Sequence, residues 1–321
     1  MIGLLPSLGT TLAALEASGQ LERCQVEWRA YARAFGGAHW FGYGGETLDL
    51  DAHGAAILAP GRFRWGAHAE ALAMPLLRSW AFRRCRALRV LNLTGVVPAL
   101  VARDLWGTPY VLQVGYDAPA VARAHGKPLR ARVLRHLLDL AVQRAAGVVF
   151  ATRELFMWYA DWPWKRPPAV VIPNGVDLEH FRPLWRCPPG KRRVAYVGRL
   201  SREKNLDLLA RACQHVGATL HLFGAGPLAA ELAALPGVTA YGPVPHYSLP
   251  TILADMDCFA MVSETEGSPK ALLEAMACRV PCLVSHAVAE AVDLTPWEAL
   301  AVVPLVAPRT GPGLAEGLET L

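Results

Sequence analysis

The sequence lacks several features that would assign it to common protein classes. No two cysteines have C-x-x-C spacing, only 18% of the 321 residues are charged, and no apolar run reaches the ~18 residues that a membrane-spanning helix needs. The first twenty residues also lack the basic segment that precedes the apolar part of a signal peptide. We therefore predict a chain that does not cross a membrane and whose first residues form a strand.

The seven cysteines are an odd number, and they are scattered through mostly apolar sequence. Cys278 and Cys282 are four positions apart, but Pro281 lies between them and no histidine cluster accompanies them. A disulfide framework usually shows an even number of cysteines in a short chain. The pattern favours reduced core thiols in a cytoplasmic protein and indicates no metal site. The cysteines are Cys24, Cys85, Cys187, Cys213, Cys258, Cys278 and Cys282.

The length and the pattern of apolar segments predict an α/β protein with two domains of about 150 residues each. Short apolar strands alternate with amphipathic helices, from "IGLLPS" near the N-terminus to "LAVVPL" near the C-terminus. This alternation is typical of βαβ units, so we expect two doubly wound, Rossmann-like parallel sheets. The expected helices span Leu12–Ala34, Glu70–Leu88, Val97–Leu105, Leu129–Arg144, Glu154–Trp158, Asn205–Val216, Leu228–Ala234, Ser248–Ala254 and Pro269–Cys278.

A segment rich in proline marks the expected domain boundary. Between Phe181 and Arg193, Pro188-Pro189-Gly190 can continue neither a helix nor a central strand, which predicts domains 1–185 and 186–321. The first carries 21 Lys and Arg against 14 Asp and Glu, a net charge of +7, and the second carries 11 against 13, a net of −2. The first domain is therefore better suited to an anionic partner. Two such domains usually leave a cleft at the carboxyl ends of their strands, where ligands bind.

Two cations follow the first strand of the second domain. In "VAYVGRLSREKN" the strand Val194–Gly198 leads to Arg199, and Lys204 precedes the next helix. Positive side chains at a strand end and a helix N-terminus suit a diphosphate. The alternative is a solvated basic loop, and this stretch alone does not separate the two.

The next expected strand ends in "LFGAGP" (222–227). Gly224 and Gly226 would let backbone N–H groups approach a ligand closely, and Pro227 suits the first position of a helix. The stretch is not a complete G-x-G-x-x-G dinucleotide motif. A tight strand-to-helix turn explains it equally well.

Two glutamates lie on either side of a predicted helix start in "ETEGSPKALLEAMACRVPC" (264–282). Ser268 suits an N-cap and Pro269 a first helical position, which places Glu266 in the loop and Glu274 inside the helix, roughly 7–8 Å along its axis. This separation excludes a close acid–base pair and favours contacts with different parts of one elongated ligand. The N–H groups of Gly267–Lys270 are then available to an anion. Glu274 is either a surface residue or, since its neighbours are apolar, a buried carboxylate that needs partners.

Residues that end two strands of the first domain give weaker signals. Gly9 follows the first strand in "LPSLGTT", at a position where phosphate-binding loops carry glycine. Tyr116 and Asp117 follow another strand in "QVGYDAP" and could meet a substrate hydroxyl, or Asp117 could cap the next helix. The basic segments "RSWAFRRCRALR" (78–89) and "KPLRARVLRHLLDLAVQR" (127–144) suit either a solvated face or contact with an anionic membrane surface.

Taken together, four stretches of the second half resemble the retaining family-4 glycosyltransferases of the GT-B fold. They are "IPNGVD" (172–177), "VGRLSREKN" (197–205), "FGAGP" (223–227) and "EGSPKALLEAMACRVP" (266–281), which has seven residues between its two glutamates. The resemblance covers most of residues 171–307 and is specific in order and spacing. The first half resembles the family mainly in its pattern.

The resemblance implies two Rossmann-like domains that face each other across a cleft, with a UDP- or GDP-sugar on the second domain. Arg199 and Lys204 would bind the diphosphate and stabilise it as the leaving group. Glu274 would bind the ribose, and Glu266 with the backbone of Gly267, Ser268, Pro269 and Lys270 would bind the transferred sugar. Gly9, Gly224 and Gly226 complete the donor side.

The resemblance further implies a hexosyltransferase that retains anomeric configuration without a bound metal or cofactor. It would act in the synthesis of a glycan, a glycolipid or a cell-surface polysaccharide. The partners would be a nucleotide sugar and a carbohydrate or lipid-linked acceptor, with no nucleic acid. The location would be cytoplasmic. Peripheral contact with the inner face of an anionic membrane is a further expectation.

The sequence departs from the family pattern at three places. Tyr116 and Asp117 stand where the family often has a histidine, and "HAVAEAV" (286–292) lacks the usual glycine pair. The family normally continues for one or two helices beyond the position of Leu321, which implies a C-terminal domain truncated here. Two alternatives stay open: a catalytically silent nucleotide-sugar-binding partner protein, and a GT-B epimerase or phosphorylase, for which no second charged cluster is evident.

Overall fold

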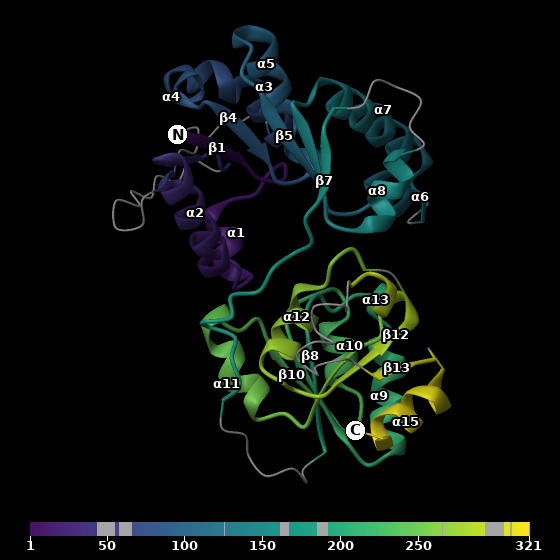
Figure 1. Cartoon of the computed structure of the whole chain (residues 1–321). Helices are drawn as coiled ribbons and strands as arrows, with labels where there is room; N and C mark the ends of the chain where they lie inside the picture. The colour runs from purple at the N-terminus through teal and green to yellow at the C-terminus, as the bar shows by residue number, and fades with distance from the viewer. Residues whose placement is uncertain are drawn as a thin grey trace. The chain divides into compact units, whose positions relative to one another are not determined.

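The computed structural model describes residues 1–43, 55–57, 66–124, 126–160, 167–184, 192–264, 266–292, 305–308 and 310–320. The chain divides into two compact units, Met1–Ile172 and Pro173–Leu321 (Figure 1). This division precedes the boundary expected at 185/186, because Phe181 is buried in the second unit against Ala195 and Phe259. The Pro188-Pro189-Gly190 segment lies outside the described residues.

The first unit is built on a parallel sheet of seven strands in the order β3-β2-β1-β4-β5-β6-β7. The first strand lies in the interior of the sheet, where Ile2 is opposite Ala38 on one side and Ala87 on the other. The order of strands along the sheet therefore reverses between β1 and β4. The strands are β1 (Ile2–Leu5), β2 (Ala38–Trp40), β3 (Ala55–Ile57), β4 (Ala87–Val90), β5 (Tyr110–Val114), β6 (Gly147–Phe150) and β7 (Ala169–Val171).

Helices cover both faces of this sheet. Alternate strand residues such as Leu4 pack with α1 and with Trp28 of α2 on one face, while Leu5 and Val90 pack with helices α3 to α8 on the other. This alternation is what a doubly wound sheet requires. The elements are α1 (Leu12–Ala17), α2 (Leu21–Phe35), α3 (Ala67–Leu77), α4 (Ser79–Arg84), η1 (Leu93–Gly95), α5 (Val97–Trp106), α6 (Ala118–Ala124), α7 (Pro128–Arg144) and α8 (Arg153–Ala160).

Two expected helices of the first unit are each two helices in the structure. The segment Leu12–Ala34 is interrupted at Gly19, whose φ of +69° is left-handed and ends the helical path after α1. The segment Glu70–Leu88 is interrupted at Arg78, with φ −117° and ψ 29°, and its last residues belong to β4. Helix α6 and strand β3 were not expected from the sequence.

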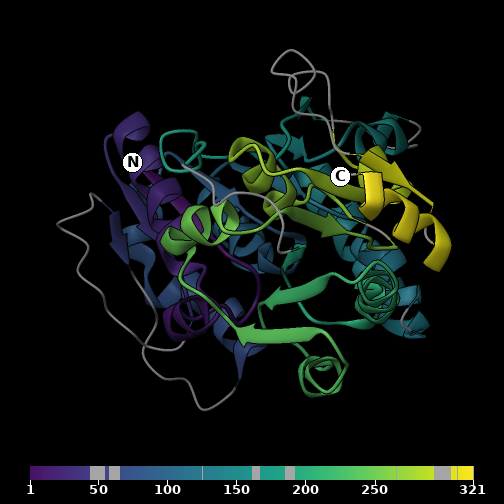
Figure 2. The ribbon, with the colours of Figure 1, turned by 90° about the horizontal axis from the view of Figure 1, so that it is seen from below.

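The second unit contains a parallel sheet of six strands in the order β10-β9-β8-β11-β12-β13. Its strands alternate as well: Val194 and Tyr196 face the helices α9, α10 and α15, whereas Ala195 faces α11, α12 and α13. Figures 1 and 2 show α15 beside α9 on one face of this sheet. The order of strands reverses between β8 and β11, the neighbours on either side of the switch point.

The elements of the second unit mostly lie where the sequence predicted them, but α13 and α15 were not expected. Residues 300–304 of the strand expected at "LAVVPL" lie outside the described residues, and β13 begins at Leu305. The strands are β8 (Arg193–Val197), β9 (Thr219–Phe223), β10 (Val238–Gly242), β11 (Cys258–Met261), β12 (Cys282–Ser285) and β13 (Leu305–Ala307). The helices are η2 (Arg202–Lys204), α9 (Leu206–His215), α10 (Ala229–Ala233), η3 (His246–Ser248), α11 (Leu249–Ala254), α12 (Lys270–Ala277), α13 (His286–Glu290) and α15 (Gly311–Thr320).

The six cysteines of the described residues are reduced thiols, and all but Cys24 are buried. Burial raises the pKa of Cys85 and of Cys213 to about 12, so both thiols stay protonated at neutral pH. Cys187 lies outside the described residues. No helix in the described part of the chain combines the length and the apolar character that crossing a bilayer would take.

Candidate functional site

The carboxyl ends of β8 and β11 bring the principal charged residues of the second unit together. All strands of this sheet are parallel, so the segments that follow them leave from the same edge. Arg199 and Lys204 follow β8, and Glu266 follows β11, its direct neighbour. Open α/β sheets bind ligands at the point where the strand order reverses. The sequence-predicted residues therefore lie at the topological switch point of the sheet.

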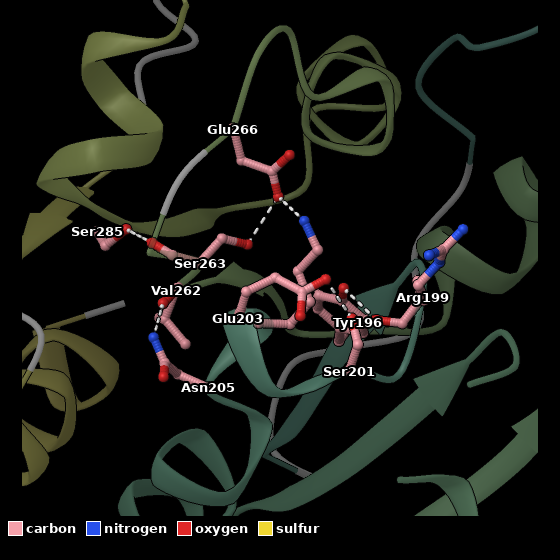
Figure 3. Close-up of polar contacts among 10 residues, drawn as sticks. Tyr196, Arg199, Ser201, Glu203, Asn205, Val262, Ser263, Glu266 and Ser285 are labelled. Carbon is pink, nitrogen blue, oxygen red and sulfur yellow. Dashed lines mark hydrogen bonds and ion pairs between the residues drawn. The ribbon is translucent and has the colours of Figure 1, made fainter. Parts of the chain in front are cut away.

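Lys204 and Glu266 form an ion pair at this edge. Lys204 Nζ donates to Glu266 Oε1 at 2.6 Å, and the two side chains are only 16% and 14% exposed. Ser263 Oγ donates to the same oxygen at 2.7 Å, as Figure 3 shows. The sequence predicted both charged residues but not that they pair, because they are far apart in the chain.

The backbone that leads to Glu266 is fixed from two neighbouring strands (Figure 3). Asn205, in the left-handed conformation with φ 51°, donates from Nδ2 to the carbonyl oxygen of Val262 at 3.1 Å. Ser285, at the end of β12, donates from Oγ to the carbonyl oxygen of Ser263 at 2.9 Å. Neither Asn205 nor Ser285 was expected as a site residue, and both act by holding the β11 end in place.

The segment after β8 contains an exposed cation, Arg199, and a carboxylate, Glu203, that is hydrogen-bonded within the same segment. Arg199 is exposed, and its carbonyl oxygen accepts a hydrogen bond from Tyr196 Oη at 3.1 Å. Ser201 Oγ donates to Glu203 Oε1 at 2.6 Å. Burial would raise the pKa of Glu203, but the bonds from Ser201 and from its own backbone N–H, with Lys204 and Arg199 nearby, lower it below its usual value. Glu203 is therefore ionised at neutral pH.

Gly224 and Gly226 are required for packing between two loops. A Cβ at Gly224 would overlap the carbonyl oxygen of Gly198, and a Cβ at Gly226 would overlap that of Leu200. The N–H of Gly224 donates to Gly242 at 2.8 Å, so it is already engaged. The sequence left two interpretations of these glycines open, close approach to a ligand and a tight strand-to-helix turn, and the ligand contact stays a prediction. In the structure they let the β9 loop lie directly on the β8 loop, which fixes the position of Arg199.

Helix α12 begins at Lys270, with Pro269 as N-cap, and Ser268 makes no capping bond. The expectation that Ser268 caps the helix is therefore wrong. Its Oγ instead accepts from the backbone N–H of Asn174 at 3.1 Å, and its carbonyl oxygen accepts from Asn174 Nδ2 at 2.7 Å. Asn174 belongs to the "IPNGVD" stretch (172–177) of the resemblance, and the structure ties this stretch to the segment that precedes α12.

Glu274 is buried within α12 and has a histidine partner. Its side chain is 6% exposed, and Oε1 lies 2.9 Å from Nε2 of His246 in η3. The ring of His246 packs against that of Phe181, with centroids 5.0 Å apart. The expectation of a buried carboxylate with partners thus describes Glu274 better than that of a surface residue. His246 was missed because nothing in "VPHYSLP" connects it to a glutamate 28 positions later.

The remaining candidates belong to the first unit. Gly9 follows β1 in a turn with φ +77°, next to the switch point between β1 and β4. Tyr116 is exposed, and Asp117 Oδ1 accepts from the N–H of Ala120 at 2.9 Å, so Asp117 caps α6. Of the two roles considered for Asp117, the helix cap is the one that a hydrogen bond in the structure supports. Among the described residues, no group of three His, Cys, Asp or Glu side chains is arranged to hold a metal ion.

Part of the sequence is similar to known glycosyltransferases. Residues 191–321 match the family model described as glycosyl transferases group 1. Over 231 residues, 64% of the chain, the sequence is 31% identical to a GDP-mannose-dependent alpha-mannosyltransferase of Mycobacterium tuberculosis (strain CDC 1551 / Oshkosh), of which the match covers 59%. The chain spans about half the length of the curated relatives it matches, from 59% down to 44%.

Solved structures match the whole chain in fold. A sucrose-phosphate synthase from Thermosynechococcus elongatus superposes with a TM-score of 0.79 at 18% identity, covering 99% of this chain and 88% of that one. Anabaena HepE, in complex with UDP and glucose, superposes with a TM-score of 0.73 at 16% identity, covering 99% and 89%. The chain therefore has the GT-B fold, as the sequence resemblance implied.

Proposed function

We propose that the protein is a retaining glycosyltransferase that moves a hexosyl group from a nucleotide-diphosphate sugar to an acceptor hydroxyl. The observation that carries the proposal is the Lys204–Glu266 pair at the switch point, within the segment that matches the glycosyl transferases group 1 model. The GDP-mannose in the name of one relative and the UDP and glucose in the HepE complex agree with a nucleotide-sugar donor. Synthesis of a glycan, glycolipid or cell-surface polysaccharide is the process that fits this activity.

In the proposed complex, different groups bind different parts of the donor. Arg199 and Lys204 bind the diphosphate, and Glu274 accepts hydrogen bonds from the ribose hydroxyls. Glu266 and the backbone of Gly267–Lys270 bind the sugar, because this segment leads into the N-terminus of α12, where the helix dipole is positive. Gly224 and Gly226 contribute by fixing the loop of Arg199, and the donor-side role of Gly9 that the sequence suggested stays a prediction.

The proposed reaction depends mainly on stabilising the departing diphosphate, and it requires no separate general base. As the bond to the sugar breaks, negative charge grows on the phosphate oxygens, where Arg199, Lys204 and the α12 N-terminus stabilise it. The acceptor oxygen bonds to the anomeric carbon from the same face that the diphosphate leaves, and a departing phosphate oxygen takes up the hydroxyl proton. Bond formation on that face retains the anomeric configuration. We propose that this transfer proceeds without a bound metal.

A screen of nucleotide sugars tests the function directly. UDP- and GDP-sugars are added to the full chain, and we expect the bound donor to raise the melting temperature. Donors that stabilise the protein are then incubated with carbohydrate or lipid-linked acceptors, and the anomeric configuration of the product is read by NMR. An inverted product would contradict retention. A donor that binds but is neither hydrolysed nor transferred would favour the silent partner protein instead.

Substitutions at the donor side test the placement of the nucleotide. Lys204→Ala and Glu274→Gln are each expected to weaken UDP or GDP binding about tenfold or more in calorimetric titration, since each removes a charge-assisted hydrogen bond. Arg202→Ala is the matched control, because Arg202 is an exposed cation of the same loop. Wild-type affinity in both Lys204→Ala and Glu274→Gln would refute this placement.

We propose peripheral contact with an anionic membrane through the N-terminal half of α7. Leu129 and Val133 are 75% and 65% exposed, and the cations Lys127, Arg130 and Arg132 around them are exposed as well. The other basic residues of the helix, Arg135 and Arg144, form ion pairs with Asp139 and Asp104. Sedimentation with anionic vesicles at low salt tests this contact, and Arg130→Ala with Arg132→Ala should abolish it.

A further inference from the structure

The Lys204–Glu266 ion pair means that the proposed diphosphate site already contains a competing carboxylate. The two side chains are mostly buried and 2.6 Å apart, so water and salt screen their attraction less than on an open surface. The Lys204 ammonium has three N–H donors, so a diphosphate that binds it competes with Glu266 for the cation and brings negative charge next to that carboxylate. The affinity of the ligand then depends on whether it supplies hydrogen-bond donors to Glu266.

We propose that Glu266 is the residue by which the site discriminates an intact nucleotide sugar from the free nucleoside diphosphate. This inference rests on the proposed function and adds a specificity-determining role to it. The free diphosphate supplies oxygens to Lys204 but no hydrogen-bond donors to Glu266. It draws the Lys204 ammonium away from a mostly buried carboxylate and places a terminal phosphate with further negative charge beside that carboxylate.

An intact donor meets Glu266 differently. Its sugar hydroxyls donate hydrogen bonds to the carboxylate that Lys204 has left, and these bonds offset the loss of the ion pair. Its diphosphate also has no terminal phosphate group, so less negative charge lies beside Glu266. The same residue therefore disfavours the product and accepts the substrate, which lowers product inhibition.

The surroundings of Glu266 keep the carboxylate in this position. Oε1 also accepts from Ser263 Oγ at 2.7 Å, and the Ser263 backbone is bonded to Ser285. Moving the carboxylate away from an arriving phosphate would break the bond from Ser263 as well. The folded loop therefore holds the Glu266 carboxylate where it competes with a phosphate for Lys204.

Glu203 provides a matched control, because it is an acid of the same region with a different partner. Its Oε1 accepts from Ser201 Oγ at 2.6 Å, while Lys204 is paired with Glu266. Glu203→Gln removes one negative charge next to Lys204, as Glu266→Gln does. A general electrostatic effect would change nucleotide affinity in both variants, whereas the proposed discrimination belongs to Glu266 alone.

The test compares UDP and GDP with UDP-glucose and GDP-mannose by calorimetric titration of wild type, Glu266→Gln and Glu203→Gln. We expect Glu266→Gln to bind the free diphosphate roughly tenfold more tightly and the nucleotide sugar more weakly, so that the preference for the donor disappears. Glu203→Gln should keep the wild-type ratio. Adding Lys204→Ala should remove the gain, as a double-mutant cycle would show.

Two outcomes would overturn the inference: unchanged or weaker diphosphate binding in Glu266→Gln, or an equal gain in Glu203→Gln. Glu266→Ala serves as a second variant, which should lose turnover without losing diphosphate affinity. Equal losses of turnover and of diphosphate affinity in this variant would also contradict the role of Glu266. Failure of the wild type to bind any of the four nucleotides would instead refute the proposed function, so the two failures are distinguishable.

Discussion

His246 and Glu274 show how burial constrains single residues in the second unit. The Glu274 side chain is 6% exposed, and removing His246 takes away a partner at 2.9 Å. We expect His246→Ala to lower the free energy of unfolding by about 1–3 kcal/mol, since a buried carboxylate then loses a hydrogen-bond donor. His246→Gln, which keeps a donor, should lose clearly less. Urea denaturation of both variants measures this, and equal losses would mean that the contact contributes little.

His39 gives the first unit a pH-dependent stability. It is buried in β2, and neither ring nitrogen has a hydrogen-bond partner within the described part of the chain. Burial lowers the pKa of His39 below its usual 6.5, and Arg84 and the N-terminal amine act in the same direction. The unfolded chain therefore binds a proton at a higher pH than the folded one. Stability is then complete above pH 6.5 and is lost as the pH falls through the lower folded pKa.

This effect of His39 is measured by urea denaturation at pH 7.5 and pH 5. We expect the wild type to lose stability between the two values and His39→Phe, which does not titrate, to lose less. A smaller residual loss should persist in the variant, because burial also lowers the pKa of His221. An identical loss in wild type and variant would contradict the assignment to His39.

Residue types and residue partners differ in how far the sequence predicts them. Arg199, Lys204, Glu266 and Glu274 stand in motifs whose order and spacing are specific, so they were predicted as candidates. Their contacts were not, because Lys204 and Glu266 are 62 positions apart and meet only through the pairing of β8 with β11. The roles that the resemblance implies for these residues remain predictions until the substitutions are tested.

At the scale of elements, the connection after β9 depends on the absence of a side chain. A Cβ at Gly226 would overlap the carbonyl oxygen of Leu200, whereas Gly175 has nothing within 4 Å of such an atom. We expect Gly226→Ala to destabilise the protein by about 1–3 kcal/mol or more, because the β8 and β9 loops must separate. Gly175→Ala, in the same unit, should change stability little. Thermal unfolding of both variants measures the difference.

Most strands were predicted, because four or five apolar residues between turn-forming residues identify a buried parallel strand. Helix ends were predicted less well, since they depend on local conformations such as that of Gly19 and on partners such as Asn174 for Ser268. Helix α6 was missed although Asp117, its cap, had been singled out. A capping residue and a substrate-binding residue look the same in sequence, and only the contact separates them.

At the scale of the whole molecule, the two units should respond differently to the nucleotide. The residues that we propose for the donor side lie within Pro173–Leu321, except for Gly9 in the first unit. We expect hydrogen exchange of the full chain with UDP or GDP to show protection at residues 198–205 and 266–274. Protection around Gly9 as well would place that loop at the donor, and protection of the first unit alone would contradict the assignment.

The hydrogen bond from Ser285 to Ser263 has a consequence for how this protein could diversify. Ser285 is almost fully buried and belongs to β12, yet it fixes the backbone from which Ser263 reaches Glu266. Substituting it would shift Glu266 without altering any group that we expect to touch a ligand. A selection for new donor preference in randomly mutated libraries would then recover changes at Ser285, and a search confined to ligand contacts would overlook them.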